Sequence, residues 1–520
     1  MSWRGAIRAG GRCRDVPATK RGTGEPLAVI RFSRFDGGDY GVSAGFRAPK
    51  DSFSGQDMVA LLDGSVAPRC GTTAIATAAQ PTGKIAGMGF FNQDAGTAVP
   101  WFVVGTAAYA SVTTPVALTG TLASTPTLPL QGVPIADKVY ISNYGDKLYR
   151  LSTTNCDPLG GLTPGGKCAV AYGDRLLVAN FPANPNRVRF SDANDFTTYG
   201  ALNFFDVGQG GQIVGMWAVR TNIFIAKNDG TWWIYTGVPG SGSDILRLAY
   251  SGLGFPADWR SGAVVGGSNV YFVAQGEQFP SYFNGSNVSS VAEQDTLGNL
   301  NATANTGLDP LVSVMALSRR GDVLALAGRG LATRTSLLFR DGKWSRASLS
   351  PILAAPVPGA TRVLVSDGGD TAAQATFAWW VPTSLERPPL GGAFDAVADV
   401  GTTLIPTLLT LPEYVDSDGR DMKVTKVLVA FRRFNQAASN RFKLRAVATR
   451  RGDGSADKSG TYRVWEEPST FGSATGVPNR LKFMAVDQDW GTGWRIELAE
   501  VRGVIIDEVS VYFQAGRVRT

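Results

Sequence analysis

The sequence predicts an all-β fold, with a β-propeller joined to a further β domain. Glycine is abundant at 63 residues and proline is frequent at 28, and both favour turns between short elements. Charged residues make up only 18% of the 520-residue chain, and helix formers at helical spacing are almost absent. Short apolar strands separated by Gly, Asp and Asn turns recur instead, which indicates many β-hairpins.

Changes in sequence texture predict three regions. Residues 1–75 are irregular and polar, with short extended runs such as 27–32, and indicate an extended N-terminal arm that crosses other elements. Residues 76–394 carry the recurring hairpins and form the predicted β-propeller with inserted loops. Residues 395–520 alternate polar and apolar side chains, which is typical of sheets with one wet face. We expect a β-sandwich-like platform domain there.

The hairpins of the predicted propeller recur roughly every 40 to 50 residues, which is the spacing of propeller blades. Clear examples lie at 139–151, 223–235, 270–285 and 323–344. A single hairpin cannot bury both of its faces, whereas hairpin units packed around an axis bury both and leave only short edges. The sequence therefore predicts roughly five to seven blades. An array of β-sandwiches is the competing interpretation.

The composition excludes several kinds of catalytic site. The chain contains no histidine, so Ser–His–Asp and Cys–His arrangements cannot form and the commonest metal ligand is missing. The Gly-rich run 208–211 lacks the Lys-Ser/Thr of a nucleotide-binding P-loop. We therefore expect a protein that is not an enzyme and that holds no cofactor or metal. A carboxylate-based glycosidase is a minor alternative, with Asp192 and Asp195, or Glu466 and Glu467, as candidate pairs; turn capping and solvated surface explain them more simply.

The four cysteines do not form the close pairs that a zinc site needs. Cys13 and Cys70 are isolated. Cys156 and Cys168 flank a Gly- and Pro-rich loop, so they could meet across a hairpin as a disulfide. Two free thiols in a protein folded in a reducing cytoplasm are the alternative.

The basic charge of the chain is concentrated at its start. The formal net charge is +7. The first 21 residues contain Arg4, Arg8, Arg12, Arg14, Lys20 and Arg21. Such an arm can bind nucleic acid, but docking on a neighbouring subunit is the interpretation we favour. No apolar signal-peptide core and no run of ~20 apolar residues is visible, so we expect synthesis in a cytoplasm and no membrane span.

Six segments follow one another in a fixed order between residues 175 and 237. They are Arg175–Ala179, Pro185–Asp192, Phe204–Gly208, Ile213–Met216, Ile223–Lys227 and Gly230–Gly237. The order runs from a Val-Arg-Phe-Ser-Asp strand through a Val-Gly turn to a hairpin that carries two tryptophans and ends in Thr-Gly. It resembles the propeller core of tail nozzle and related tail tube proteins of short-tailed bacteriophages. Residues 395–520 resemble the platform domain of that family more loosely.

The resemblance implies a structural subunit of a bacteriophage tail, located in the virion. It implies a homohexameric ring that docks on a portal–adaptor complex, extends the DNA channel, supports tail fibres and passes double-stranded DNA during ejection. A receptor- or carbohydrate-binding tail protein is the alternative, and a polysaccharide-degrading tail enzyme ranks third. The host, its receptor, the gating residues and the fibre partners have no recognisable signal in the sequence.

Two pairs of side chains are the candidate interface or lumen residues. Arg187 and Arg189 lie two apart on a predicted strand and so share a face. They could line a lumen, but a channel must let DNA slide, so we prefer pairing with carboxylates of a neighbouring subunit. In the pair Trp232 and Trp233 we expect one ring in the core and one pointing outward. A place in the core or at a subunit interface explains both tryptophans better than stacking on sugars or bases does.

Overall fold

The computed structural model describes residues 28–32, 35, 54–56, 58–60, 64–68, 72–75, 80–91, 98–127, 129–159, 165–252, 263–273, 280–290, 314–317, 323–327, 336–340, 343–347, 353–357, 363–366, 376–380, 407–411, 413–415, 420–433, 441–449, 458–466, 478–484 and 490–518. Every regular element within these ranges is a β-strand, which confirms the all-β prediction. The six basic residues of the predicted arm, together with Cys13, Cys70 and Glu467, lie outside the described residues.

Consecutive four-stranded antiparallel sheets form the first four blades of a propeller. Blade one comprises β6 (Ile85–Phe90), β7 (Pro100–Val104), β8 (Ala107–Ala110) and β9 (Val116–Ala117). Blade two comprises β10 (Gly132–Ile135), β11 (Lys138–Ser142), β12 (Leu148–Leu151) and β13 (Cys156–Pro158). Blade three comprises β14 (Cys168–Tyr172), β15 (Arg175–Phe181), β16 (Asn184–Phe190) and β17 (Phe204–Asp206). Blade four comprises β18 (Ile213–Val219), β19 (Asn222–Lys227), β20 (Thr231–Thr236) and β21 (Ile245–Ser251).

The last three blades follow the same plan. Blade five comprises β22 (Val264–Gly266), β23 (Asn269–Val273), β24 (Pro280–Phe283) and β25 (Val288–Ser290). Blade six comprises β26 (Val314–Leu317), β27 (Val323–Ala327), β28 (Ser336–Arg340) and β29 (Lys343–Ala347). Blade seven comprises β30 (Leu353–Pro356), β31 (Val363–Ser366) and β32 (Phe377–Trp380), and its outermost strand is β5 (Thr72–Ala74).

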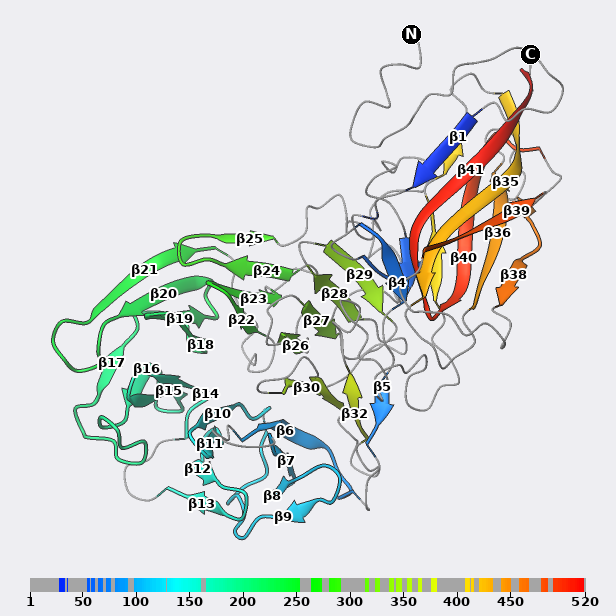
Figure 1. Cartoon of the computed structure of the whole chain (residues 1–520). Coiled ribbons are helices and arrows are strands. Elements are labelled where there is room, and N and C mark those ends of the chain that lie inside the picture. Colours follow the sequence, from blue (N-terminus) through cyan, green and yellow to red (C-terminus); the bar gives the residue numbers. More distant parts are fainter. Residues whose placement is uncertain are drawn as a thin grey trace.

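The blades close into a ring. Contacts between the first strands run from β6 through β10, β14, β18, β22 and β26 to β30, and β30 in turn contacts β6 (Figure 1). Blade seven takes its outermost strand, β5, from a segment that precedes blade one in the sequence. Ala74 of β5 is registered with Ala378 of β32. The described residues thus form a seven-bladed propeller, and the array of separate β-sandwiches is excluded.

In blades one to four, both faces of the sheet pack against a neighbouring blade. The core between blades three and four, for example, combines Leu177 and Val188 of blade three with Ile213 and Ile225 of blade four. A strand inside such a stack has no wet face, so its sequence is apolar at successive positions rather than at alternate ones. Strand β18 follows this pattern, with six of its seven residues buried.

Buried polar side chains near the ends of the second strands tie blades together. Ser142 Oγ donates to the carbonyl of Gly166 at 2.9 Å and so joins blade two to blade three. Asn180 Nδ2 donates to the carbonyl of Ile213 at 2.5 Å and joins blade three to blade four. Lys227 Nζ donates to the carbonyl of Val207 at 3.1 Å, in the connection between the same two blades. Because buried polar groups must be hydrogen-bonded, these contacts fix how adjacent blades meet.

The second domain is a β-sandwich. One sheet contains β1 (Ala28–Phe32), β3 (Met58–Ala60), β4 (Val66–Pro68), β35 (Arg420–Arg433), β39 (Pro478–Met484) and β41 (Val504–Val518). The facing sheet contains β2 (Ser54–Gln56), β33 (Leu408–Thr410), β34 (Tyr414–Val415), β36 (Arg441–Thr449), β37 (Lys458–Ser459), β38 (Arg463–Glu466) and β40 (Gly493–Arg502). Their shared core combines Phe32 and Met58 from the start of the chain with Leu444, Leu498 and Phe513 from its end.

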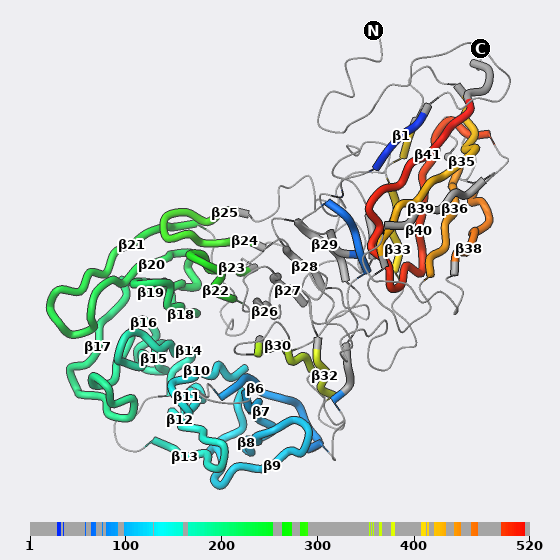
Figure 2. Tube along the Cα trace, viewed as in Figure 1, coloured from blue at the N-terminus to red at the C-terminus, as the bar shows by residue number. Residues whose placement is uncertain are grey.

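A continuous sheet links the sandwich to the propeller. Strand β2 pairs in parallel with β29 of blade six, with Gln56 registered to Arg346, and pairs antiparallel with β33 of the sandwich. The result is one 11-stranded sheet that runs from blade six into the sandwich. Figure 2 follows the chain from β1 in the sandwich around the propeller ring and back to β41 beside β1.

Candidate functional site

Strand β16 supplies the side chains of the candidate site. Its burial alternates: Val188 and Phe190 belong to the core shared with blade four, whereas Arg187 and Arg189 are only half-buried. Residues two apart on a strand share a face. The prediction that the two arginines share a face agrees with this structure, in which both line one cavity.

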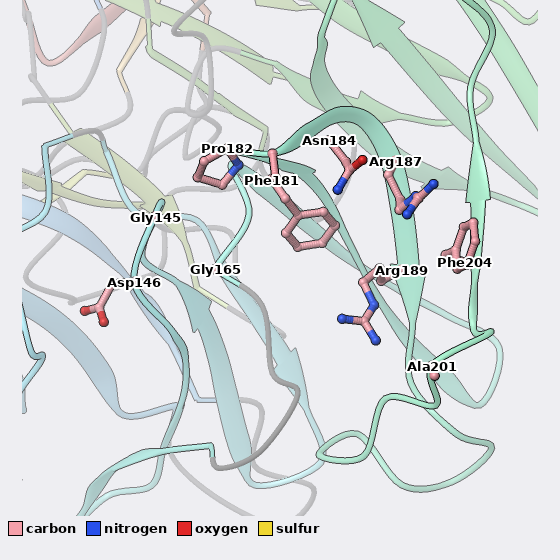
Figure 3. Close-up of a pocket in the computed structure, with 11 residues that line it drawn as sticks. Gly145, Asp146, Gly165, Phe181, Pro182, Asn184, Arg187, Arg189, Ala201 and Phe204 are labelled. Atoms are coloured by element: carbon pink, nitrogen blue, oxygen red, sulfur yellow. The ribbon is translucent and has the colours of Figure 1, made fainter.

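The cavity lies where blade two meets blade three and has a volume of about 510 Å³. Blade two contributes the turn at Gly145 and Asp146, and blade three contributes the β15–β16 hairpin and the start of β17. Figure 3 shows Phe181 between the blade-two turn and the two arginine side chains. The size falls within the range of small-molecule sites.

Arg187 is held in place by two neighbours on β17. Its Nε donates to Asp206 Oδ1 at 2.8 Å and its Nη2 donates to Asp206 Oδ2 at 2.9 Å, which is a bidentate ion pair. Its guanidinium carbon lies 3.9 Å from the centroid of the Phe204 ring. The hydrogen bonds to Arg187 lower the pKa of Asp206, and those to Asp206 raise the pKa of Arg187.

The sequence predicts that Arg187 pairs with a carboxylate of a neighbouring subunit. Asp206 of the same chain already pairs with Arg187, so no such partner is needed. Arg187 and Asp206 are directly registered across β16 and β17, so the ion pair forms within one blade. Arg189 donates from Nη2 to the carbonyl of Gly200 at 3.2 Å, in the connection between the same strands. Contacts of either arginine with another subunit or with a lumen stay predictions.

A close backbone contact forms the wall between the two blades. Gly145 N donates to the carbonyl of Gly165 at 3.3 Å. A Cβ on Gly165 would lie 2.5 Å from the carbonyl oxygen of Asn143, so only glycine lets the chain pass here. Asp146 stabilises the same turn from inside blade two, since its Oδ2 accepts from Tyr149 Oη at 2.9 Å and from Asn143 Nδ2 at 3.3 Å.

Both tryptophans of β20 pack inside the propeller, so the expectation that one ring points outward is wrong. Trp232 is fully buried, and its ring centroid lies 4.3 Å from that of Phe283 in blade five. Trp233 is half-buried and packs on the opposite side, against the core of blades three and four. Adjacent residues point to opposite faces of a strand, and in a propeller both faces meet another blade.

Cys156 and Cys168 are both buried and are not joined by a disulfide. Cys156 lies in the core between blades one and two, whereas Cys168 lies in the core between blades three and four. Burial raises the pKa of Cys156 to about 11, so its thiol stays protonated and unreactive at neutral pH.

The candidate carboxylate pair Asp192 and Asp195 lies in the connection between β16 and β17. Asp195 Oδ1 accepts from the backbone N of Thr197 at 2.9 Å and from its hydroxyl at 2.6 Å. These and further bonds from Thr198 lower the pKa of Asp195 to about 2. Asp192 Oδ1 accepts from Asn203 Nδ2 at 2.6 Å. An acid that is ionised down to about pH 2 cannot protonate a leaving group near neutral pH, so this pair fits turn capping. Among the described residues, no group of three or more Cys, Asp or Glu side chains is placed to hold a metal ion.

Several residues of the site had no signal in the sequence. Asp206 and Phe204 contact Arg187 because of the register of β17, and a 13-residue connection, 191–203, precedes that strand. Phe181 and Gly165 reach the cavity because the propeller brings blade two against blade three. No helix long and apolar enough to cross a membrane occurs in the part of the chain that the structure describes.

Comparisons with known proteins identify no family for this chain. No protein-family model matches the chain, and no curated protein is significantly similar to it. Among solved structures, BamB from Moraxella catarrhalis is 14% identical with a TM-score of 0.38, over 63% of this chain and 98% of BamB. PorZ, a surface component of the type-IX secretion system of Porphyromonas gingivalis, is 9% identical with a TM-score of 0.37, over 59% of this chain and 37% of PorZ. YCF48 bound to D1 peptide is 13% identical with a TM-score of 0.34, over 60% of this chain and 95% of YCF48. These likenesses carry no argument about function, and the propeller itself rests on the strand pairing.

Proposed function

We propose that this protein is a structural subunit of a bacteriophage tail and not an enzyme. The observation that carries the proposal is the construction of the molecule: a closed ring of seven blades continues, through one sheet, into a sandwich. Such a body offers the surfaces of two joined β domains for other subunits to dock on. The segment that resembles tail nozzle and tail tube proteins, residues 175–237, forms β15 to β20 and so spans blades three and four.

In this proposal the subunits assemble into a ring, with six copies as the expected number. The ring docks on the portal–adaptor complex, supports tail fibres and surrounds the path of double-stranded DNA during ejection. A channel wall must let DNA slide, so a large unpaired basic surface would oppose this function. Four cationic side chains of the sandwich are paired with carboxylates: Arg445 and Arg495 both contact Glu497, and Arg441 and Lys443 both contact Glu500.

Imaging of the purified protein tests this proposal. Negative-stain electron microscopy, with the mass measured in solution, should show symmetric rings with a central pore. A trimeric fibre that binds glycans would instead support a receptor-binding tail protein. Release of reducing sugar from bacterial polysaccharide would overturn the proposal that the protein is not an enzyme.

A further inference from the structure

The cavity between blades two and three joins two features that a site for an acidic small molecule needs. Two guanidinium groups, Arg187 and Arg189, lie on one side, and apolar surface from Phe181, Pro182 and Phe204 lies around them. The exposed side chain of Asn184 on the hairpin adds an amide that can both donate and accept hydrogen bonds. Figure 3 shows these side chains around one hollow.

Arg187 has donor capacity left for a ligand. A guanidinium carries five N–H groups, and the ion pair with Asp206 uses those on Nε and Nη2. Within the described residues, its Nη1 donates to no protein acceptor. The ion pair and the Phe204 ring fix the guanidinium plane before any ligand arrives, which lowers the entropy lost on binding. A guanidinium is charged at every physiological pH, and the hydrogen bonds to Asp206 raise the pKa of Arg187 further.

We propose that this cavity binds a carboxylate-bearing sugar of the hexuronic acid class. The carboxylate would accept hydrogen bonds from Arg187 and Arg189, since a planar guanidinium matches a carboxylate. The C–H face of the sugar ring would pack on Phe181 and Pro182, and its hydroxyls would reach Asn184. The volume of about 510 Å³ accommodates one or two sugar rings and is small for a protein partner. The inference does not rest on the proposed tail function, because it concerns one chain alone.

Calorimetric titration of the full chain with D-glucuronate tests the proposal, with D-glucose, acetate and a glutamate-rich peptide as comparison ligands. Glucuronate should bind saturably with a Kd on the order of 1 mM or tighter, and glucose and acetate should each bind at least ~10-fold more weakly. Arg189→Gln should weaken glucuronate binding by about 10- to 100-fold, because a charge-assisted hydrogen bond is lost. Asn184→Ala should weaken it by about 2- to 10-fold.

Arg247→Gln is the matched control, because it removes the same charge from an exposed position on β21, outside the cavity. It should leave binding unchanged. The proposal is overturned if glucuronate shows no saturation at ~10 mM, if glucose binds equally well, or if Arg247→Gln has the effect of Arg189→Gln. Tighter binding of the glutamate-rich peptide would also overturn it and would identify the cavity as a protein docking site. If Arg189→Gln fails to fold, unchanged binding by Asn184→Ala together with equal binding of glucose still rejects the proposal.

Discussion

Trp232 shows how one side chain joins two blades. Its ring stacks on Trp217 within blade four, with centroids 5.8 Å apart, and on Phe283 of blade five. Phe272, also in blade five, lies 5.1 Å away. The side chain therefore packs against rings of two sheets at once.

Trp232→Ala should lower the free energy of unfolding by ~3–5 kcal/mol, because it leaves a cavity in a fully buried aromatic cluster. Chemical denaturation monitored by fluorescence or circular dichroism measures the change. Val238→Ala is the control at an exposed apolar position and should change stability by less than ~0.5 kcal/mol. Equal effects of the two substitutions would show that the Trp232 ring is not buried.

Asn180 combines an unusual backbone angle with a bond between blades. Its φ is +59°, a left-handed conformation that asparagine tolerates better than most residues, and the side chain is fully buried. Asn180→Ala should cost about 2–5 kcal/mol, from the lost hydrogen bond to Ile213 and from backbone strain. Asn180→Gly should cost ~1 kcal/mol less, since glycine removes the strain alone. Asn194 is exposed and also has a φ of +59°, so the same substitutions at Asn194 are the control for backbone strain without the hydrogen bond between blades. Equal unfolding midpoints for the two Asn180 variants would contradict this account.

Asp195 makes the stability of its loop depend on pH. Its pKa in the folded protein is about 2, compared with 3.8 for an unperturbed aspartate, so the ionised form favours folding. That stabilisation is present above about pH 4 and is lost as the pH falls through about 2. The difference in melting temperature between the wild type and Asp195→Asn should therefore be largest above about pH 4 and should shrink toward about pH 2. A difference that stays constant with pH would exclude the bonds to Thr197 and Thr198 as the cause.

At the scale of elements, the short strand β5 completes blade seven. It supplies the outermost strand of blade seven from a point before blade one in the chain. Ile75 N donates to the carbonyl of Phe377 at 3.4 Å, so Thr73, two residues earlier, also directs its backbone groups toward β32. The intervening Ala74 directs its N–H away from β32.

Proline substitutions on β5 test its pairing with β32. Thr73→Pro removes a donor that faces β32 and should cost about 1–3 kcal/mol, because a ladder hydrogen bond is lost. Ala74→Pro removes a donor that faces away and should cost clearly less. Hydrogen exchange of the β32 amides distinguishes the two, since only Thr73→Pro should raise their exchange rates. The reverse order would mean that the register of β5 differs from the one described.

At the scale of the whole molecule, the sandwich depends on both ends of the chain. Strand β1 pairs with β41, and its Ile30 and Phe32 enter the sandwich core beside Phe513. A chain that lacks residues 1–35 should therefore lose apolar contacts of the sandwich and unfold at a lower temperature. A chain that lacks only residues 1–26 retains β1 and is the control; it should melt at a higher temperature than the chain that lacks residues 1–35. Calorimetry measures both, and equal melting temperatures would show that β1 adds no stability.

The propeller could be predicted from the sequence because its signal is local. The hairpins at 139–151 and 223–235 are β11–β12 and β19–β20, and each carries its strands and turn within about a dozen residues. Pairing between distant segments was not predictable in this way. The joining of β5 to β32, and of β1 to β41, spans hundreds of residues, and short segments such as Thr72–Ala74 fit many sheets equally well. The site divides in the same way. That Arg187 and Arg189 share a face follows from strand geometry and could be predicted. That Asp206 is the partner of Arg187 depends on how β17 is registered after a long connection, and could not.

The pairing of β1 with β41 determines how the molecule would respond to a mechanical load. Ala28, at the start of β1, is registered with Phe513, in the last part of β41, so the two chain ends leave the sheet from the same side (Figure 1). Tension applied between the ends would break the residue pairs between β1 and β41 one after another, starting from Ala28 and Phe513, instead of shearing all the pairs at once. The strand β1 would peel away first. The next strand along the chain is β2, which pairs both with β29 of blade six and with β33 of the sandwich, so the load would next reach the junction between the propeller and the sandwich.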